Sequence, residues 1–395
     1  MARFLYPTHT DLPTQADVVV IGGGIVGAAT AFYSSRAGLE TAVVEMRDAL
    51  GTLATAASAG TFRALFDDRD VVALTKASIK ILKNMAEVIR LPGYEIGLHP
   101  QGYLFASREP DGLSILGQAV EHKRCIGLDD VELLDGPEAR YRFPYLGPEV
   151  TAALYRAEDG WLSPHEATYG FALGSKARFL LETRATRIVL DGQGVCGVET
   201  ELGTISSRTV VLAAGAFAAR LAATVGLDLP LDVVRLQQVV VHPQWPIPQW
   251  APVTVDWTTN GYWRPEVGGA LVGWSDLLTP NEEPREQVRP DWEFPAQALA
   301  YAGRTTPFWK EVAARLTGPQ MHASAGQVAF PHDLKPILGP VPGLAGLYLN
   351  VGHAYGVMAA PEAGRRVVDL ITGRMPDTEN AFGYPRLVAQ EAARQ

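Results

Sequence analysis

Cysteine is scarce in this chain of 395 residues and occurs only at Cys125 and Cys196. Two cysteines with no short spacing between them predict neither a disulfide framework nor a thiolate metal site. The histidines also lack the spacing that is typical of metal ligands, so we expect no bound metal. Because no disulfide has to be maintained, a reducing cytoplasm is the expected compartment.

Long apolar runs and a surplus of basic residues are lacking as well. No stretch approaches the roughly 20 apolar residues of a transmembrane helix, and residues 1–15 show no signal-peptide pattern. The formal net charge is −9, whereas nucleic acids and anionic membranes attract basic surfaces. Both are therefore excluded as the main partner, and we expect a small molecule instead.

The sequence does contain a strand–turn–helix–strand pattern close to its beginning. Residues 17–21 form a short apolar run rich in β-branched residues, as expected of a strand that is buried on both faces. Helical spacing follows over residues 25–37, and after the break at Gly38 a second strand is expected at residues 41–45. This order predicts a right-handed parallel βαβ unit.

A glycine turn joins the first strand of this unit to its helix. Gly22 permits the tight turn, Gly24 lets the backbone approach a pyrophosphate, and Gly27 lets the helix pack on the strand. The N–H groups that begin the helix attract phosphate charge, and a carboxylate at Glu45 is placed to accept the hydroxyls of a ribose. An unrelated glycine-rich turn would leave Glu45 unexplained. The predicted dinucleotide contacts are Gly22, Gly24, Ile25, Val26, Gly27 and Glu45.

Similar buried strands recur at residues 208–217 and 346–351, and a closing helix is expected at residues 361–373. Between them, residues 230–280 alternate apolar with polar positions, which predicts an antiparallel sheet with one solvated face. A chain of this length is expected to form two domains. The order of these patterns favours a discontinuous nucleotide-binding domain with a second domain inserted into it. The βαβ unit alone does not distinguish FAD from NAD, although Glu45 disfavours the 2′-phosphate of NADP.

Four segments together resemble the D-amino-acid oxidase-like flavoproteins, the family of glycine oxidase, sarcosine oxidase and D-amino-acid dehydrogenases. They are residues 16–45, 55–66, 208–218 and 329–364. The resemblance implies an α/β fold in which a Rossmann-like FAD-binding domain carries an inserted α+β substrate domain built on an antiparallel sheet. It places the FAD-binding domain at residues 1–84, 151–220 and 326–395, and the substrate domain at residues 85–150 and 221–325.

The resemblance also implies which further residues contact the flavin. These are Ala59, Gly60, Ala214, Gly215, Gly352, Tyr355, Gly356 and Val357. Tyr355 takes the place of a histidine in a loop that commonly reads Gly-His-Gly in the family. No cysteine or histidine of residues 55–66 or 326–356 matches a position of covalent flavin attachment, so we expect non-covalent FAD.

Two departures from the family concern the substrate and the electron acceptor. Val328 stands where glycine oxidase has an arginine that grips the substrate carboxylate. Residues 268–273 lack the lysine that helps monomeric sarcosine oxidase to activate dioxygen. We therefore expect either dioxygen or another carrier to accept the electrons, and the missing lysine favours a carrier.

Arg63 lies in the segment that resembles the flavin-flanking loop of the family and is our first candidate for a site residue near the flavin. Arginine suits the binding of a substrate carboxylate because its planar fork binds two oxygens. The alternative interpretation is a surface arginine that pairs with Asp67 or Asp68.

Four other residues are candidates for catalytic roles. Arg264 follows an aromatic pair on an expected strand and is a candidate carboxylate clamp, with the hydroxyl of Tyr262 beside it. The alternative is a strand-edge arginine before Pro265. Tyr355 and His353 lie in the glycine-rich loop, whose backbone N–H groups are expected to stabilise negative charge at the pyrimidine end of the flavin. For both of these side chains, packing beneath the ring is the alternative.

The predicted activity is oxidation of the C–N bond of an amino acid or N-substituted amino acid to an imine, by hydride transfer to FAD. A second interpretation is oxidation of a 2-hydroxy acid or a polyol, which needs a base such as His353. A third is a flavin-binding subunit that acts only together with partner chains.

Overall fold

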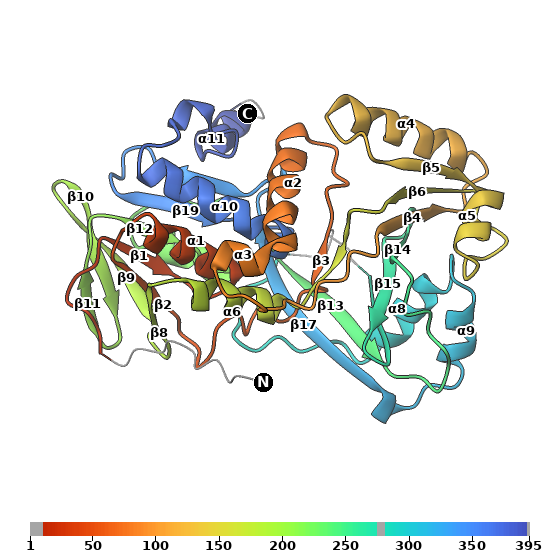
Figure 1. Cartoon of the computed structure of the whole chain (residues 1–395). Coiled ribbons are helices and arrows are strands. Elements are labelled where there is room, and N and C mark those ends of the chain that lie inside the picture. Colours follow the sequence, from red (N-terminus) through yellow and green to blue (C-terminus); the bar gives the residue numbers. More distant parts are fainter. Residues whose placement is uncertain (1–10, 275–280, 393–395) are drawn as a thin grey trace.

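A six-stranded sheet forms one side of the protein (Figure 1). The computed structural model describes residues 11–274 and 281–392. The strand order is β18-β19-β12-β1-β2-β8, and neighbours run parallel except for the antiparallel pair β18–β19. The strands are β1 (Val18–Ile21), β2 (Thr41–Val44), β8 (Arg178–Leu180), β12 (Val210–Leu212), β18 (Ile337–Pro340) and β19 (Leu347–Val351). The four strands expected of this sheet are therefore confirmed.

Two helices cover this sheet and begin at the same cavity. Helix α1 (Ile25–Arg36) follows β1 as predicted, and helix α10 (Gly356–Ile371) begins earlier than the expected residue 361. The helices approach each other closely at Gly364 of α10. A Cβ at this position would lie only 2.8 Å from the backbone nitrogen of Thr30 in α1. Residues at the start of both helices line one large cavity.

An eight-stranded sheet forms the other side of the molecule (Figure 1). Its order is β17-β13-β16-β15-β14-β4-β6-β5, and the only parallel neighbours among the described strands of this sheet are β14 and β4. The strands are β4 (Tyr103–Ser107), β5 (Glu132–Asp135), β6 (Ala152–Arg156), β13 (Asp232–Val241), β14 (Val253–Asp256), β15 (Gly261–Glu266), β16 (Gly269–Trp274) and β17 (Met321–Phe330). The antiparallel pairing expected within residues 230–280 is thus confirmed for the described strands β13, β14, β15 and β16. The expected solvated face is not found, because β14 is buried at every position and β16 at all but its last. Residues 275–280 of this range lie outside the described residues.

Smaller elements complete the fold. A three-stranded sheet contains β9 (Ala185–Asp191), β10 (Gly194–Thr200) and β11 (Gly203–Ser206), and β3 (Thr61–Phe62) pairs with β7 (Gly160–Trp161). The other helices are α2 (Arg69–Lys83), α3 (Met85–Ile89), α4 (Gly112–Cys125), α5 (Gly136–Arg142), α6 (Pro164–Gly174), α7 (Ala218–Ala223), α8 (Phe294–Ala302), α9 (Phe308–Ala313) and α11 (Pro385–Ala392), with 3-10 turns η1 (Gly215–Phe217), η2 (Gly318–Gln320) and η3 (Asp377–Glu379).

The two large sheets draw on alternating parts of the chain, which supports the proposal of an inserted domain. Strand β6 pairs in the eight-stranded sheet although residues 151–220 were assigned to the FAD-binding part. Strand β17 also belongs to that sheet and runs past residue 325, to Phe330. The domain boundaries are therefore a proposal that divides the eight-stranded sheet, since one limit assigns all of β6 to the FAD-binding part and another cuts through β17.

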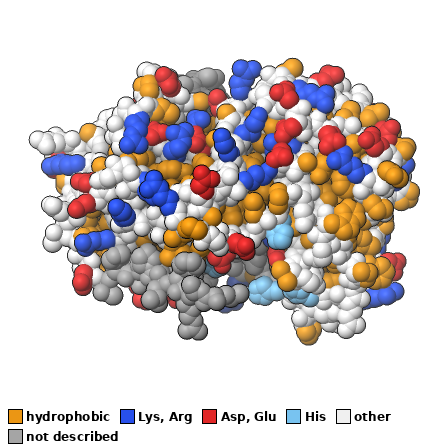
Figure 2. Space-filling model, in the orientation of Figure 1, with side chains coloured by type: hydrophobic (Ala, Val, Ile, Leu, Met, Phe, Trp, Pro, Cys, Tyr) orange, Lys and Arg blue, Asp and Glu red, His pale blue; other side chains and the backbone are white. Residues whose placement is uncertain are grey.

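The surface carries both signs of charge. Figure 2 shows acidic and basic side chains interspersed over the visible face, so this face has no broad basic patch. Among residues 11–274 and 281–392, no helix is long and apolar enough to cross a membrane.

Candidate active site

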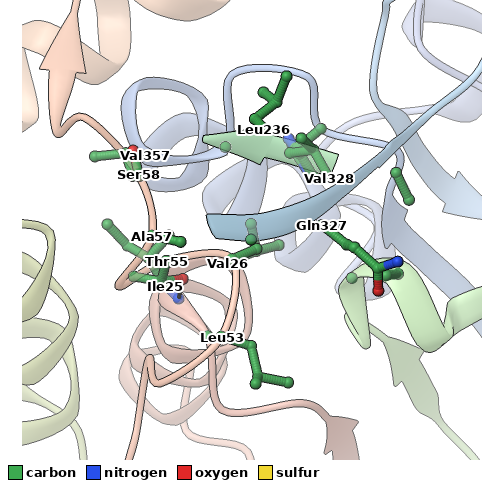
Figure 3. A pocket seen from close by; sticks show the side chains of 18 of the residues that line it. Ile25, Val26, Leu53, Thr55, Ala57, Ser58, Leu236, Gln327, Val328 and Val357 are labelled. Atoms are coloured by element: carbon green, nitrogen blue, oxygen red, sulfur yellow. Dashed lines mark hydrogen bonds between the residues drawn. The ribbon is translucent and has the colours of Figure 1, made fainter. Parts of the chain in front are cut away.

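A cavity of about 1670 Å³ lies between the two sheets. It is larger than the roughly 300–1,000 Å³ of sites for drug-sized ligands, so it has room for a dinucleotide together with a substrate. Figure 3 shows its two walls: Ile25 and Val26 lie at the start of α1, and Leu236 and Val328 lie on strands β13 and β17.

The glycine turn forms one end of this cavity. Gly22 has φ +113°, and a Cβ on it would lie 2.5 Å from the carbonyl oxygen of Ala213, so only glycine fits this turn. Gly24 caps α1 without a side-chain hydrogen bond, and Gly24, Ile25 and Val26 line the cavity. The positive end of α1 therefore faces the cavity and suits a pyrophosphate.

Glu45 lies at the end of β2 and also lines the cavity. Its carboxylate accepts hydrogen bonds from the backbone N–H groups of Gly23, at 2.6 Å, and Arg47, at 2.9 Å. Burial raises the pKa of Glu45, and these two N–H groups oppose that rise. A carboxylate has about four acceptor positions, so two remain for the hydroxyls of a ribose.

Most of the predicted cofactor contacts do reach the cavity. Those that line it are Gly22, Gly24, Ile25, Val26, Glu45, Ala59, Ala214, Gly215, Gly352, Tyr355, Gly356 and Val357. Gly27 and Gly60 do not line it. Both are packed tightly against backbone, because a Cβ on Gly27 would collide with the Gly22 carbonyl and a Cβ on Gly60 with the Leu162 carbonyl. Their role is close packing behind the cavity wall. The two helix N-termini that line the cavity, the glycine backbone and Glu45 together fit FAD.

A charged segment, residues 281–291, crosses the cavity beside Glu45. Its middle lines the cavity, and Glu286 forms ion pairs with Arg47, at 3.3 Å, and Arg184, at 2.6 Å. The Gln327 side chain holds the backbone of this segment from β17. These contacts were not anticipated, because ion pairs between residues so far apart in the chain leave no pattern in the sequence.

His353 lines the cavity in a fixed tautomer. The Thr30 hydroxyl donates to the Val26 carbonyl, at 2.8 Å, and accepts from Asn350 Nδ2, at 2.9 Å. The Asn350 Oδ1 therefore faces His353 Nε2, at 2.8 Å, so Nε2 carries the proton. Burial lowers the pKa of His353 to about 3, and its Nδ1 has no hydrogen-bond partner among the described residues. His353 is thus a neutral acceptor near neutral pH.

We expect His353 to stay neutral from about pH 5 to about pH 8, whereas an unperturbed histidine titrates there. In ¹⁵N NMR spectra of histidine-labelled protein, the Nδ1 and Nε2 shifts of His353 are expected to stay constant over this range. The unfolded chain protonates this histidine near its ordinary pKa, so its contribution to stability is present above about pH 6.5 and is lost as the pH falls. A His353 signal that titrates near pH 6.5 contradicts this assignment.

Arg63 points into a group of aromatic rings at the other end of the cavity. Its guanidinium carbon lies 4.3 Å from the ring centre of Phe66, 5.7 Å from that of Tyr103 and 5.5 Å from that of Phe105. Its Nη1 donates to the Leu65 carbonyl, and no ion pair joins it to an acid of the described chain. The guanidinium is therefore free to bind an anion.

The surface-pair interpretation of Arg63 does not hold, because both neighbouring acids have other partners. Asp67 pairs with Lys123 at 2.6 Å, and Asp68 pairs with Lys335. Each lysine is far from Arg63 in the sequence, so only the fold makes these pairs visible.

Arg264 lies outside the cavity lining, so a role as carboxylate clamp is not supported. The side chain is 5% exposed, its Nε donates to the Ala59 carbonyl at 2.8 Å, and its Nη1 pairs with Glu266 at 2.9 Å. It thus holds the loop that flanks the cavity. Tyr262, by contrast, lines the cavity, and burial raises the pKa of its hydroxyl.

One further polar residue of the cavity, Gln238, escaped prediction. Gln238 of β13 lines the cavity with its Oε1 buried and without a hydrogen-bond partner in the described chain. The sequence signal that could have identified Gln238 is a side-chain amide next to the apolar residues of an expected strand. The Tyr355 hydroxyl is also buried and unpartnered among the described residues, and its ring packs on Phe66, with ring centres 4.6 Å apart. Burial raises the pKa of Tyr355, so its hydroxyl stays protonated.

Comparison with solved structures finds the same fold. L-proline dehydrogenase from P. horikoshii is similar with a TM-score of 0.81 and 26% identity, over 92% of this chain and 95% of that one. Glycine oxidase from Geobacillus kaustophilus also has a TM-score of 0.81 and 26% identity, over 95% of this chain and 98% of that one.

Sequence relatives include both longer and equally long proteins. Dimethylglycine dehydrogenase of Rattus norvegicus is 24% identical over 92% of this chain, and 4-methylaminobutanoate oxidase (formaldehyde-forming) of Paenarthrobacter nicotinovorans is 27% identical over 96%. The chain spans only 44% and 46% of these two relatives. Glycine oxidase of Geobacillus kaustophilus is 29% identical over 90% of this chain and 92% of its own length.

The match to a protein family covers most of the chain. The family model described as "DAO: FAD dependent oxidoreductase" matches residues 17–370. The matched range includes both helix ends that open into the cavity, Glu45 and Arg63. The chain therefore belongs to the FAD-dependent oxidoreductase family of D-amino-acid oxidase-like enzymes, and its cofactor is FAD.

Proposed function

We propose that this enzyme oxidises the C–N bond of an amino acid, or of an N-substituted amino acid, to an imine. The observation that carries the proposal is the guanidinium of Arg63, which lines the cavity without an acidic partner among the described residues. FAD held by the glycine turn and Glu45 would supply the redox chemistry, as an acceptor for a hydride from the carbon that bears the amine. The residues of the chain bind and orient the substrate.

Arg63 and Tyr355 are the proposed ligands of the substrate carboxylate. Both contact Phe66, which places the guanidinium and the unpartnered hydroxyl beside the same ring. A carboxylate between them receives charge-assisted hydrogen bonds from both donors. In glycine oxidase an arginine at the place of Val328 binds the substrate carboxylate, and in this chain the pair takes over that role.

The amine is proposed to bind at the buried Oε1 of Gln238. The three acids that line the cavity, Glu45, Asp67 and Glu286, are each engaged by hydrogen bonds or ion pairs. No described acid therefore stands ready to bind an ammonium group, and a neutral amine is favoured. An N–H of such an amine satisfies the otherwise unpaired amide oxygen. The relatives named for glycine, dimethylglycine and 4-methylaminobutanoate support a substrate that carries both an amine and a carboxylate.

Oxidation of a 2-hydroxy acid or polyol is disfavoured, because it needs a base to take the hydroxyl proton. His353 is the residue considered for this role, but its pKa of about 3 makes it a poor base. Burial also raises the pKa of Tyr262 and Tyr355, so neither is a phenolate near neutral pH.

Matched pairs of substrates test this choice. The FAD-loaded protein is mixed without oxygen with an amino acid, its N-methyl derivative and the 2-hydroxy acid of the same carbon skeleton. We expect the amines to bleach the flavin and the hydroxy acids to leave it oxidised. Bleaching by hydroxy acids alone would falsify the proposal.

The electron acceptor and any partner chains belong to the same proposal. We propose non-covalent FAD and an acceptor other than dioxygen, since β16 carries no lysine. The alternative, a flavin-binding subunit that acts only together with partner chains, predicts no bleaching of the isolated chain. Full bleaching of the flavin in the isolated chain, followed by slow reoxidation in air, is the expected result.

A further inference from the structure

Asp159 is a fully buried acid that no part of the proposed function uses. It lies in the turn between β6 and β7 and has an exposed fraction of 0%. It does not line the cavity. Burying a carboxylate is costly unless it is paired, so its contacts call for an explanation.

The carboxylate of Asp159 binds the backbone immediately after Arg63. Its Oδ1 accepts a hydrogen bond from the backbone N–H of Ala64, at 3.1 Å. The residues on either side strengthen this connection, since Thr61 pairs with Trp161 and Phe62 pairs with Gly160 between β3 and β7. The residues on both sides of Arg63 are therefore held, Thr61 and Phe62 by strand β7 and Ala64 by Asp159.

The contact is also fixed from the side of Asp159. The Asp159 backbone carbonyl accepts from the Gly102 N–H, at 2.8 Å, just before β4. Arg156 forms an ion pair with the Asp159 carboxylate and a second one with Asp130, at 2.7 Å. Arg156 offsets only part of the cost of burial, which still raises the pKa of Asp159 to about 7, and Oδ2 has no hydrogen-bond partner among the described residues. The contacts of Asp159 are thus concentrated on Oδ1, which meets both Arg156 and Ala64.

This anchor holds the peptide group that follows Arg63, the residue whose guanidinium lines the cavity. The Arg63 N–H is held as well, by the Met358 sulfur at 3.4 Å. With both flanking N–H groups bound, the backbone at Arg63 has little freedom, and its side chain extends over Phe66, Tyr103 and Phe105. Precise placement of such a charge determines how well it binds two carboxylate oxygens.

We propose that Asp159 is a positioning residue that holds the Arg63–Ala64 peptide and so aims the Arg63 guanidinium at the substrate carboxylate. This inference rests on the proposed role of Arg63. It assigns a function to a buried acid that touches neither the cavity nor the substrate.

The test uses benzoate as a carboxylate probe and benzamide as its neutral counterpart, each titrated into the FAD-loaded protein. Binding is read from the change in the visible flavin spectrum. Asp159→Asn keeps an oxygen that accepts from Ala64, whereas Asp159→Ala and the similarly bulky Asp159→Leu remove it. We expect the two latter variants to bind benzoate about tenfold more weakly, with benzamide unchanged and Asp159→Asn close to wild type.

A double-mutant cycle separates positioning from a general structural role. In an Arg63→Gln background, Asp159→Leu is expected to have no further effect on benzoate binding. An effect that persists there, or that weakens benzoate and benzamide equally, overturns the inference. If Asp159→Ala does not fold, Asp159→Leu serves as the variant without the accepting oxygen. Loss of benzoate binding in Asp159→Asn also contradicts the inference. If the wild type itself shows no Arg63-dependent preference for benzoate, the proposed function fails first.

Discussion

Replacing Arg63 with glutamine is expected to weaken binding of the amino-acid substrate about 30- to 150-fold, with the FAD content unchanged. This range corresponds to the loss of about 2–3 kcal/mol when a charge-assisted pair in a desolvated site is broken. Glutamine keeps much of the side-chain length but loses the charge and the fork that binds two oxygens. The dependence of the anaerobic flavin-reduction rate on substrate concentration measures the change.

A matched variant and a matched substrate make this result specific. Arg315→Gln removes an exposed arginine beside α9, whose side chain is 69% exposed, and is expected to leave reduction unchanged. The corresponding amine, which has the carbon skeleton of the substrate without its carboxyl group, is expected to react equally slowly with wild-type and Arg63→Gln protein. If Arg63→Gln reduces the rate with both substrates by the same factor, Arg63 does not bind the carboxylate.

Replacing Gly24 with valine is expected to weaken FAD binding about a hundredfold without unfolding the chain. A Cβ on Gly24 meets only the Thr55 hydroxyl, at 3.3 Å, and the extended φ of −70° suits other residues. The first carbon of the added side chain therefore requires only a small shift of Thr55, whereas the side chain as a whole occupies the place where the backbone meets the pyrophosphate. Flavin content after purification and titration with added FAD measure the effect.

The control for this variant is Gly192→Val, in the turn after β9. A Cβ there meets nothing within 4 Å, so both the fold and the FAD content are expected to stay as in the wild type. Thermal unfolding in the absence of FAD checks that Gly24→Val remains folded. A Gly24→Val protein that purifies with full FAD would show that the dinucleotide does not approach this turn.

The dinucleotide end of the site could be predicted from sequence because its determinants are local. Gly22, Gly24 and Glu45 belong to one βαβ unit, in which the strand, turn and helix fix their relative positions. The family resemblance extended this prediction to the loop before α10. The predicted contacts then reached the cavity, except for Gly27 and Gly60, which pack behind its wall.

The substrate end could not be predicted in the same way, because its partners come together only in the folded chain. The environment of Arg63 depends on lysines that draw Asp67 and Asp68 away and on a buried acid almost a hundred positions later, Asp159. Arg264 was predicted from its aromatic neighbours, but its guanidinium binds a loop carbonyl instead of facing the cavity. Strand alternation indicates which side a residue faces and does not indicate its partner.

We expect the cavity to hold FAD next to a site for an amine that carries a carboxylate. Anaerobic titration of the FAD-loaded chain with amino acids, N-methylated amino acids and opines is the decisive measurement. At least one of these compounds is expected to bleach the flavin completely, with the corresponding keto acid or aldehyde as the product. A flavin that is reduced by dithionite and by no amine of the panel contradicts the proposed function.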